Sequence, residues 1–355
     1  MVPLFVGSTS GFSGKNVVCL GMGKRFINDG VKIGYFKPVG VFPAQHEGTL
    51  TDEDVVFFKD ALNLTDALID ICPIVLTDGL LTRVLTGQAV GLCEKMLDAF
   101  NKVAEGKDMV LVNGLGSLHH GEFMGCAGLN LINATGAKVI LTDRFEYLNL
   151  SVDGFLQAKE LLGDKLIGVI VNRIDPGKID KVRELAVPFL KERGISVLGM
   201  MSEDPVLGAV TVGDLRETLG GDLVCGEDNL DSLVERFCIG AMNVESALRV
   251  FRRVPKKAVV TGGDRSDIQL AALETSTRCL VLTGDLYPSQ QIIIRAEECG
   301  VPIIVVPLDT QTTVEKFESI LGAMSIRNEK KVARAVALVE QTVDFKTIYS
   351  ALGLK

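Results

Sequence analysis

Short runs of apolar residues recur along this chain, and stretches with helical apolar periodicity lie between them. The apolar runs occupy residues 2–6, 31–40, 109–112, 137–142, 166–171 and 194–201. Short continuous runs are typical of strands that are buried on both faces of a sheet. Helical periodicity occupies residues 17–27, 55–62, 91–104, 151–162 and 180–193. The alternation predicts an α/β fold in which a parallel sheet carries helices on both faces.

The pattern changes at residues 207–221, where glycines interrupt it and indicate a hinge. Beyond the hinge, helices are predicted between strands at residues 258–261, 279–283 and 302–306. Residues 325–352 are predicted to form helices with an apolar stripe, suited to packing back on the protein or to pairing subunits. We therefore predict three parts, namely a first domain at residues 1–208, a smaller α/β domain at 209–320 and a helical tail at 321–355.

Composition narrows the class of protein. The 355 residues are 47% hydrophobic and carry a net charge of −8, which fits a globular protein and argues against a general nucleic-acid binder. Eight scattered cysteines without a C-x-x-C pair, and the lack of a signal peptide, predict reduced thiols and a cytoplasmic location. No apolar run reaches the roughly 18 residues that cross a bilayer, so no membrane partner is predicted.

One loop carries a strong chemical signal. Residues 7–16, with the sequence GSTSGFSGKN, follow the first apolar run and precede the first helical stretch. The backbone N–H groups of such a loop can surround an anion, and the helix N-terminus adds roughly half a positive charge. Lys15 would reach the β- and γ-phosphates of a nucleotide as a catalytic residue. The predicted nucleotide-binding residues of the loop are Ser10, Gly11, Phe12, Ser13, Gly14, Lys15 and Asn16.

The loop departs from the pattern G-x-x-x-x-G-K-[ST] in two places. Thr9 stands where the first glycine belongs, and Gly7 comes two residues earlier, so the loop is longer than usual. Asn16 replaces the Ser or Thr whose hydroxyl normally binds Mg²⁺. The sequence therefore favours nucleotide binding over hydrolysis. The alternative interpretation is a glycine-rich turn that only packs a strand against a helix.

Other polar residues lie where strands end or helices begin. Lys37 follows the second strand at the edge where parallel sheets bind ligands, so we predict a catalytic contact to phosphate or substrate; a solvated lysine is the alternative. Asp54, with Asp52 as the less favoured choice, is predicted to bind Mg²⁺, although both also suit helix capping. Asn113 ends the third strand, where a second acidic metal ligand is expected. Together with Asn16 it places two neutral amides at metal positions, which weakens Mg²⁺ binding.

Two further candidates lie outside these segments. Asn172 ends another strand and could bind a purine base, although a turn-forming asparagine is equally compatible with the pattern. In the second domain, a glycine turn and an acidic residue precede a helix, where acidic side chains commonly act as caps. The sharper hypothesis is a site for a small anionic effector, formed by Gly262, Gly263, Asp264 and Arg265.

Five segments in order, GSTSGFSGKN, GYFKPVG, TDEDVVFF, VLVNGLGS and GVIVNRI, resemble the dethiobiotin synthetase and cobyrinate amidotransferase branch of P-loop proteins. The segment VVTGGDRSDIQLAAL resembles the DRTGG domain. This pairing is similar to the region before the catalytic domain in long bacterial phosphotransacetylases, and to stand-alone phosphotransacetylase-like proteins. The resemblance covers residues 2–320 and stops before that catalytic domain, so acetyl transfer is not expected.

The resemblance also implies roles for single residues. By it, Lys15 is the phosphate-loop lysine, Lys37 a lysine at the substrate and γ-phosphate, Asp54 the metal-linked acid and Asn172 a base contact. Dethiobiotin synthetases usually have Thr where this chain has Asn16 and Glu where it has Asn113. These differences argue against a ligase activity of the carboxylation type.

Three functional hypotheses follow. The first is a cytoplasmic protein that binds ATP or ADP, with weak binding of Mg²⁺ and at most slow ATP hydrolysis, and whose DRTGG domain senses or transmits a metabolic signal. The second is an ATP-dependent ligase that activates a carboxyl or carbamate as a mixed phosphate anhydride. The third is a structural partner whose loop binds no nucleotide. P-loop proteins of the resembling branch commonly pair across the nucleotide face, so a homodimer is expected.

Overall fold

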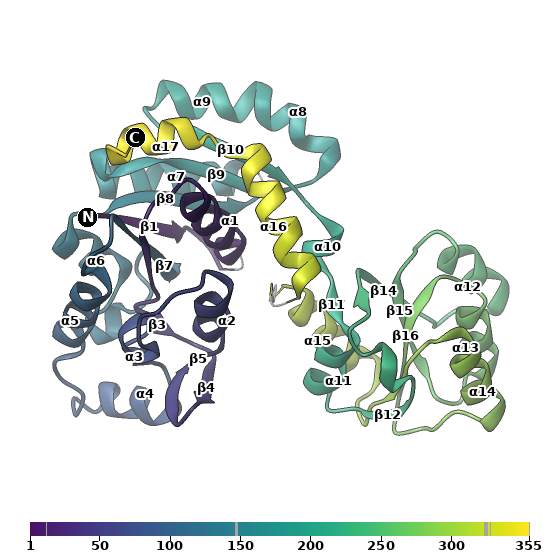
Figure 1. Cartoon of the computed structure of the whole chain (residues 1–355). Helices are drawn as coiled ribbons and strands as arrows, with labels where there is room; N and C mark the ends of the chain where they lie inside the picture. Colours follow the sequence, from purple (N-terminus) through teal and green to yellow (C-terminus); the bar gives the residue numbers. More distant parts are fainter. Residues whose placement is uncertain (12, 146–147, 323–325, 327, 355) are drawn as a thin grey trace. The chain divides into compact units, whose positions relative to one another are not determined.

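The computed structural model describes residues 1–11, 13–145, 148–322, 326 and 328–354 of the chain. The chain forms two compact units (Figure 1). Unit 1 comprises Met1–Glu203 and Ile326–Lys355, and unit 2 comprises Asp204–Ser325. Unit 1 is therefore discontinuous in sequence, because unit 2 is inserted before its last segment.

Unit 1 is built on a six-stranded parallel sheet, which confirms the predicted α/β fold. The strands in spatial order are β10 (Val197–Ser202), β9 (Leu166–Ile174), β8 (Lys138–Arg144), β1 (Val2–Ser8), β7 (Met109–Ser117) and β2 (Ile33–Phe36). Because every pairing is parallel, the carboxyl ends of all six strands meet at one edge. At that edge Ser8 of β1 pairs with Thr142 of β8 and with Ser117 of β7.

Helices cover both faces of this sheet (Figure 1). The main ones are α1 (Lys15–Asn28), α5 (Leu92–Ala104), α6 (Gly128–Thr135), α7 (Leu148–Leu162) and α9 (Val187–Glu192), and the three-residue helix α8 (Ile179–Lys181) comes before α9. Successive residues of each strand point to opposite faces of the sheet. On one face, Phe5, Val112 and Leu141 pack in a core with residues of α5, α6 and α7. On the other face, Gly23 of α1 lies close to Leu111 of β7. This alternation is what a sheet buried on both sides requires.

The chain between β2 and α5 forms small elements beside the main sheet. They are β3 (Val39–Gly40), β4 (Pro43–His46), β5 (Thr49–Asp52), α2 (Glu53–Ala61), α3 (Leu68–Ile71), β6 (Ile74–Val75) and α4 (Asp78–Leu85). Pro38, which lacks an N–H donor, separates β2 from β3. The side chain of Asp52 caps α2 by accepting from the backbone N–H of Asp54. The cap sets Asp52 and Asp54 side by side at the start of the helix.

The last segment of the chain completes unit 1. It forms two helices, α16 (Glu329–Thr342) and α17 (Phe345–Leu352). Helix α16 packs so closely on α1 that a Cβ atom at Gly21 would lie 2.4 Å from the Cβ of Val339. In α17, the rings of Phe345 and Tyr349 meet the ring of Phe26 edge to face, with centroids 6.0 Å and 5.6 Å away. The helix that begins at the glycine-rich loop is thus covered by residues from the opposite end of the chain.

Unit 2 contains a second, mixed sheet of five strands. Their spatial order is β12 (Asp222–Cys225), β17 (Ile303–Val305), β16 (Thr277–Thr283), β15 (Lys257–Gly262) and β14 (Arg236–Ile239). Strand β12 is antiparallel to β17, and the other pairings are parallel. The longer helices are α11 (Val212–Leu219), α12 (Val244–Phe251), α13 (Ser266–Leu273), α14 (Gln290–Cys299) and α15 (Thr310–Gly322). Within the stretch predicted as a hinge, Thr211 and Asp214 form a capping box that begins α11.

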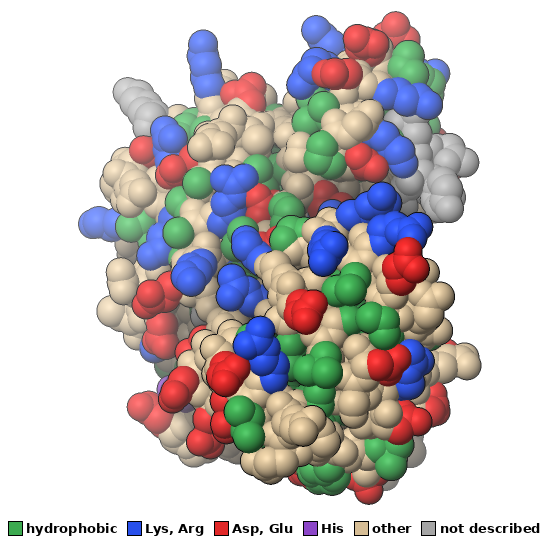
Figure 2. Space-filling view, turned by 90° about the vertical axis from the view of Figure 1, so that its right-hand side faces the viewer, with side chains coloured by type: hydrophobic (Ala, Val, Ile, Leu, Met, Phe, Trp, Pro, Cys, Tyr) green, Lys and Arg blue, Asp and Glu red, His purple; other side chains and the backbone are tan. Residues whose placement is uncertain are grey.

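The surface in Figure 2 carries basic, acidic and hydrophobic side chains interspersed with one another. Exposed hydrophobic side chains of unit 2 include Leu270 of α13, Ile294 of α14 and Tyr287 in the loop before α14. None of the described helices combines the length and the apolar character that a membrane crossing needs.

Candidate functional site

The glycine-rich loop lies at the carboxyl edge of the main sheet, between the end of β1 and the start of α1. Gly14, the residue before the helix, has φ 85° and ψ 23°, a left-handed conformation that side-chain-bearing residues rarely adopt. The turn therefore requires glycine at this position. It aims the unpaired N–H groups of the first turn of α1 toward the loop, which is the geometry of an anion site.

Lys15 is folded back over the loop. Its Nζ donates to Oγ of Ser8 at 2.9 Å, and Ser8 Oγ also lies 2.6 Å from the carbonyl oxygen of Gly116 at the end of β7. Burial lowers the pKa of Lys15 to about 8, while Cys19 and Asp143 oppose this shift. The ammonium is thus held in a poorly solvated position, where a bound anion would favour its charged form.

Asp143, at the end of β8, faces the same loop. Its carboxylate accepts hydrogen bonds from the hydroxyls of Thr9 and Ser10 and from the backbone N–H of Arg144. Asp143 is not among the site residues predicted from the sequence. A signal was available, because this acidic residue ends a buried strand, but its partner loop follows only from the pairing of β8 with β1.

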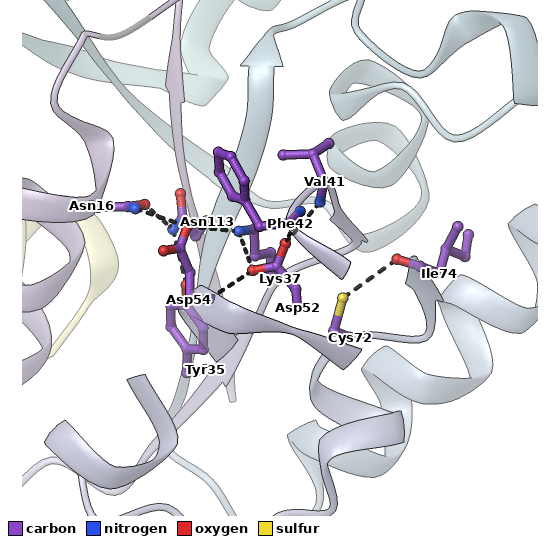
Figure 3. A network of polar contacts seen from close by, with 10 residues as sticks. All are labelled: Asn16, Tyr35, Lys37, Val41, Phe42, Asp52, Asp54, Cys72, Ile74 and Asn113. Atoms are coloured by element: carbon purple, nitrogen blue, oxygen red, sulfur yellow. Dashed lines mark hydrogen bonds and ion pairs between the residues drawn. The ribbon is translucent and has the colours of Figure 1, made fainter. Parts of the chain in front are cut away.

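Lys37 is buried between two carboxylates, as Figure 3 shows. Its Nζ donates to Oδ1 of Asp52 at 2.7 Å and to Oδ2 of Asp54 at 3.0 Å. Asp52 also accepts from the backbone N–H groups of Val41, Phe42 and Asp54. Burial acts to lower the pKa of Lys37, but Asp54 and Asp52 together raise it above its ordinary value. Lys37 is therefore an ammonium, and Asp52 is its structural anchor.

The two asparagines at the expected metal positions are joined to this cluster (Figure 3). Nδ2 of Asn16 donates to Oδ2 of Asp54 at 3.0 Å. Nδ2 of Asn113 donates to Oδ1 of Asn16 at 2.8 Å and lies 2.9 Å from the hydroxyl of Tyr35. Tyr35 is fully buried and stacks on Phe58 of α2, with ring centroids 4.4 Å apart. The three residues predicted as metal ligands are thus brought together in one hydrogen-bonded chain.

This donor set does not fit a resident Mg²⁺. Mg²⁺ takes oxygen ligands in near-octahedral geometry. Here Asn16 and Asn113 direct amide hydrogens at their neighbours, and Oδ2 of Asp54 already accepts from Asn16 and Lys37. Among the described residues, no group of three or more His, Cys, Asp or Glu side chains could hold a metal ion.

The remaining candidates of unit 1 lie beside the loop. Nδ2 of Asn172 donates to the backbone oxygen of Ser13 at 2.9 Å, so this buried residue supports the loop from β9. The hydroxyl of Ser13 is buried without a hydrogen-bond partner in the described structure. Gly11 is exposed, while Phe12 lies outside the described residues.

The predicted effector residues of unit 2 form the turn from β15 to α13. The guanidinium of Arg265 donates to both carboxylate oxygens of Asp267 at 3.0 Å and to the carbonyl oxygen of Met242 at 3.1 Å. The carbonyl oxygens of Gly262 and Gly263 accept from Nε2 of Gln269, a buried residue that the sequence analysis missed. An anion at this turn would have to compete with Asp267 for Arg265.

Two families match the chain. Residues 3–211 match the AAA domain, and residues 214–320 match the DRTGG domain. These matches confirm the resemblance to a P-loop domain followed by a DRTGG domain.

Curated relatives align with nearly the whole chain over about half of their own length. A phosphate acetyltransferase of Synechocystis is 23% identical over 385 residues, covering 98% of this chain and 51% of the relative. A phosphate acetyltransferase of Nitratidesulfovibrio vulgaris is 26% identical over 374 residues, again covering 98% of this chain and 51% of the relative. The chain thus spans about half the length of the curated relatives it matches.

Similarity to solved structures is low. The MinD cell division protein of Aquifex aeolicus aligns with a TM-score of 0.37 and 16% identity, over 58% of this chain and 84% of that chain. A cobyrinic acid a,c-diamide synthase of Mycobacterium smegmatis, solved with ADP and magnesium, gives 0.35 and 13%, over 57% and 87%. The CBS and DRTGG domains of a Clostridium perfringens pyrophosphatase, solved with diadenosine tetraphosphate, give 0.30 and 21%, over 41% and 70%.

Proposed function

The chain belongs to the AAA domain family, and from that premise we propose that unit 1 binds an adenine nucleotide, ATP or ADP, at its glycine-rich loop. The observation that carries the proposal is the placement of Lys15 at the start of α1. Its ammonium donates to Oγ of Ser8 at the end of β1, and the left-handed Gly14 leads directly into the first turn of α1, whose N–H groups have no partner within the helix. A polyphosphate placed there would meet several donors and one half-buried positive charge.

Two neighbouring side chains support this assignment. The buried hydroxyl of Ser13 lies in the same loop without a hydrogen-bond partner in the described structure, and a phosphate oxygen would supply one. Asn172 donates to the Ser13 carbonyl oxygen. It lies at the end of β9, two strands away from β1 in the sheet, where it could contact the nucleotide base. We propose Ser10, Gly11, Phe12, Ser13, Gly14, Lys15 and Asn16 as the phosphate-binding residues, with Asn172 at the base.

Hydrolysis is proposed to be slow at most. Catalysis of phosphoryl transfer depends on cations that neutralise the developing charge and on a group that orients the attacking water. Asn16 and Asn113 offer amides where a hydroxyl and an acid would hold a metal ion. Binding rather than turnover is therefore the property we assign to unit 1.

Unit 2 is proposed to be regulatory. Its DRTGG domain would sense a small anionic effector at the turn formed by Gly262, Gly263, Asp264 and Arg265, with Arg265 exchanging Asp267 for the anion. We further propose that the protein works as a cytoplasmic homodimer. Analytical ultracentrifugation at two protein concentrations tests the dimer, and a single species of one chain mass at both would contradict it.

Isothermal titration with ATP and ADP tests the nucleotide proposal. Lys15→Ala is expected to weaken ATP binding by about tenfold to a hundredfold, because it removes a charge-assisted hydrogen bond to phosphate. Lys24→Ala is the matched control, since Lys24 lies on the same helix away from the loop and its loss should leave affinity unchanged. Equal heats for the wild type and for Lys15→Ala, or no binding at all, would contradict the proposal.

Phosphate release in the same samples separates the neighbouring hypotheses. Tight binding with little release supports a nucleotide-binding regulator. Release that rises when carboxylic or diamino substrates are added would instead favour an ATP-dependent ligase.

A further inference from the structure

A lysine ammonium lies close to the position where a standard P-loop site binds its metal ion. In proteins with the standard loop, the residue after the lysine supplies a hydroxyl to Mg²⁺. In this chain that residue, Asn16, shares a carboxylate oxygen with Lys37: both donate to Oδ2 of Asp54, each at 3.0 Å (Figure 3). The Lys37 ammonium is therefore joined to the residue at the metal position through a single carboxylate oxygen.

The amide orientations follow from the charge of Asp54. Turning the oxygen of Asn16 toward a carboxylate would set two acceptors against each other, so its Nδ2 must face Asp54. The oxygen of Asn16 then faces Asn113, whose Nδ2 donates to it and contacts the Tyr35 hydroxyl. Each link fixes the next, and the amide oxygen that could bind a metal is used within the chain.

The ammonium is held firmly in this position. Lys37 is 5% exposed and Asp52 is fully buried, while three backbone N–H groups bind the Asp52 carboxylate independently of the lysine. Much of the charge of Asp52 is therefore met by the backbone, and Asp54 is left as the direct counter-ion of Lys37. A buried charge pair of this kind loses several favourable contacts if either partner leaves.

We propose that the Lys37 ammonium takes the place of a divalent cation, so that this site binds its nucleotide without Mg²⁺. The inference rests on the proposed nucleotide-binding function and specifies its cofactor requirement. Two neutral amides at the metal positions remove the negative charge that a metal would otherwise offset. Lys37 then balances Asp54, which would otherwise repel the phosphates.

The first test compares ATP affinity in excess Mg²⁺ and in excess EDTA. The wild type is expected to bind with about the same Kd in both, in contrast to sites where the metal bridges phosphates and protein. Binding in Mg²⁺ alone would overturn the inference while leaving the nucleotide-binding function intact. Binding in neither condition would overturn both.

A pair of variants tests the role of Lys37 itself. Lys37→Met keeps roughly the length of the side chain but removes the ammonium that offsets the Asp54 charge, so ATP affinity in EDTA should fall by roughly tenfold or more, and Mg²⁺ should recover part of it. Lys37→Met combined with Asp54→Asn also removes the carboxylate charge that Lys37 offsets, and the response to Mg²⁺ should disappear again. A response that is the same in the single and the double variant would contradict the assignment.

A third variant, designed to gain a Mg²⁺ requirement, tests the proposal even if the Lys37 variants fail to fold. Asn16→Thr with Asn113→Asp supplies the hydroxyl and the carboxylate that a metal site needs. This variant should bind ATP more tightly in Mg²⁺ than in EDTA, unlike the wild type. An unchanged ratio would show that these positions do not control the cation requirement, which would overturn the proposal.

Discussion

Single charged residues in this protein are stabilised in quite different ways. Asp52 is fully buried, yet it accepts hydrogen bonds from three backbone N–H groups and from Lys37. Lys257 of unit 2 is just as inaccessible, but its Nζ donates to the hydroxyl of Thr275 and lies over the ring of Phe251. The first is a charge solvated by the protein, whereas the second is a charge that burial disfavours.

The stability of the protein should therefore depend on pH through Lys257. Burial lowers the pKa of Lys257 to about 8, with Cys238 acting in the opposite direction, against 10.5 for an ordinary lysine. Between these values the unfolded chain binds more protons than the folded chain, so folding becomes more favourable as the pH rises. Relative to Lys257→Met, the wild type should gain about 2 kcal/mol of unfolding free energy between pH 8 and 10.

Urea denaturation of both proteins at the two pH values measures this gain. Lys256→Met is the matched control, because the neighbouring Lys256 is half exposed and pairs with Glu235 at 2.6 Å. Its difference from the wild type should not vary with pH in the same way. A Lys257→Met difference that is flat across the range would contradict the lowered pKa.

At this scale the sequence predicted residue types better than partners. The sequence indicates Lys15, Lys37, Asp54, Asn16 and Asn113 as candidates because each lies where a strand ends or a helix begins. Their contacts could not be predicted, because a side-chain partner depends on which strands are neighbours in space. The pairing of Asp143 with the loop hydroxyls, for example, requires β8 to lie beside β1.

Helix α1 is the element on which both halves of unit 1 depend. Its first turn faces the glycine-rich loop, and its outer side is covered by α16 and α17 from the end of the chain. Two glycines allow this close packing: Gly21 faces Val339 of α16, and Gly23 faces Leu62. A small residue at such a contact lets two helices approach each other closely.

Gly21→Ala should destabilise unit 1. The new Cβ would lie 2.4 Å from the Cβ of Val339, an atom fixed by the backbone of α16, so the helices must separate. We expect a loss of about 1–3 kcal/mol, as is typical of overpacking, despite the better helix propensity of alanine. Thermal unfolding measures the loss.

Gly23→Ala serves as the control on the same helix. Its Cβ would meet the methyl ends of Leu62, at 3.0 Å and 3.1 Å, which can rotate away, so a smaller effect is expected. Adding Val339→Gly to Gly21→Ala should recover part of the lost stability. If the two alanine variants melt alike, the α1–α16 contact is not the cause.

The order of elements was more predictable than their connections. The predicted parallel sheet is confirmed. It could be predicted because each of its strands is a local apolar run. The antiparallel strand β12 and the return of α16 to α1 depend on contacts between residues far apart in the sequence, which local periodicity does not encode. Likewise, helix α11 lies in the stretch predicted as a hinge and is not predicted as a helix, because Gly213 interrupts its short apolar pattern.

On the scale of the whole molecule, the P-loop unit is made of two separate stretches of chain. Met1–Glu203 supplies the sheet and the site, and Ile326–Lys355 supplies the cover of α1. The two stretches are joined by hydrogen bonds as well as by packing, since the backbone N–H of Asp344 donates to the oxygen of Leu198 in β10 at 2.7 Å. Unit 2, by contrast, is one continuous stretch.

Removal of residues 326–355 should therefore weaken the first unit rather than the second. Without α16 and α17, apolar residues of α1 such as Phe26 would be exposed to water, and the amides of α1 should exchange faster. Hydrogen exchange on the full chain and on the shortened chain measures this, with the amides of β15 and β16 as the internal control. Equal protection of α1 in both proteins would contradict the expectation.

The split of unit 1 also has a consequence during synthesis on the ribosome. Helix α1 is translated before Asp204–Ser325, but its cover is translated only after the whole of that segment. The DRTGG domain, which is one continuous stretch of chain, can fold while unit 1 still lacks α16 and α17. The domain that comes second in the sequence would then be the first to be finished, and unit 1 would be complete only after Ile326–Lys355 had been synthesised.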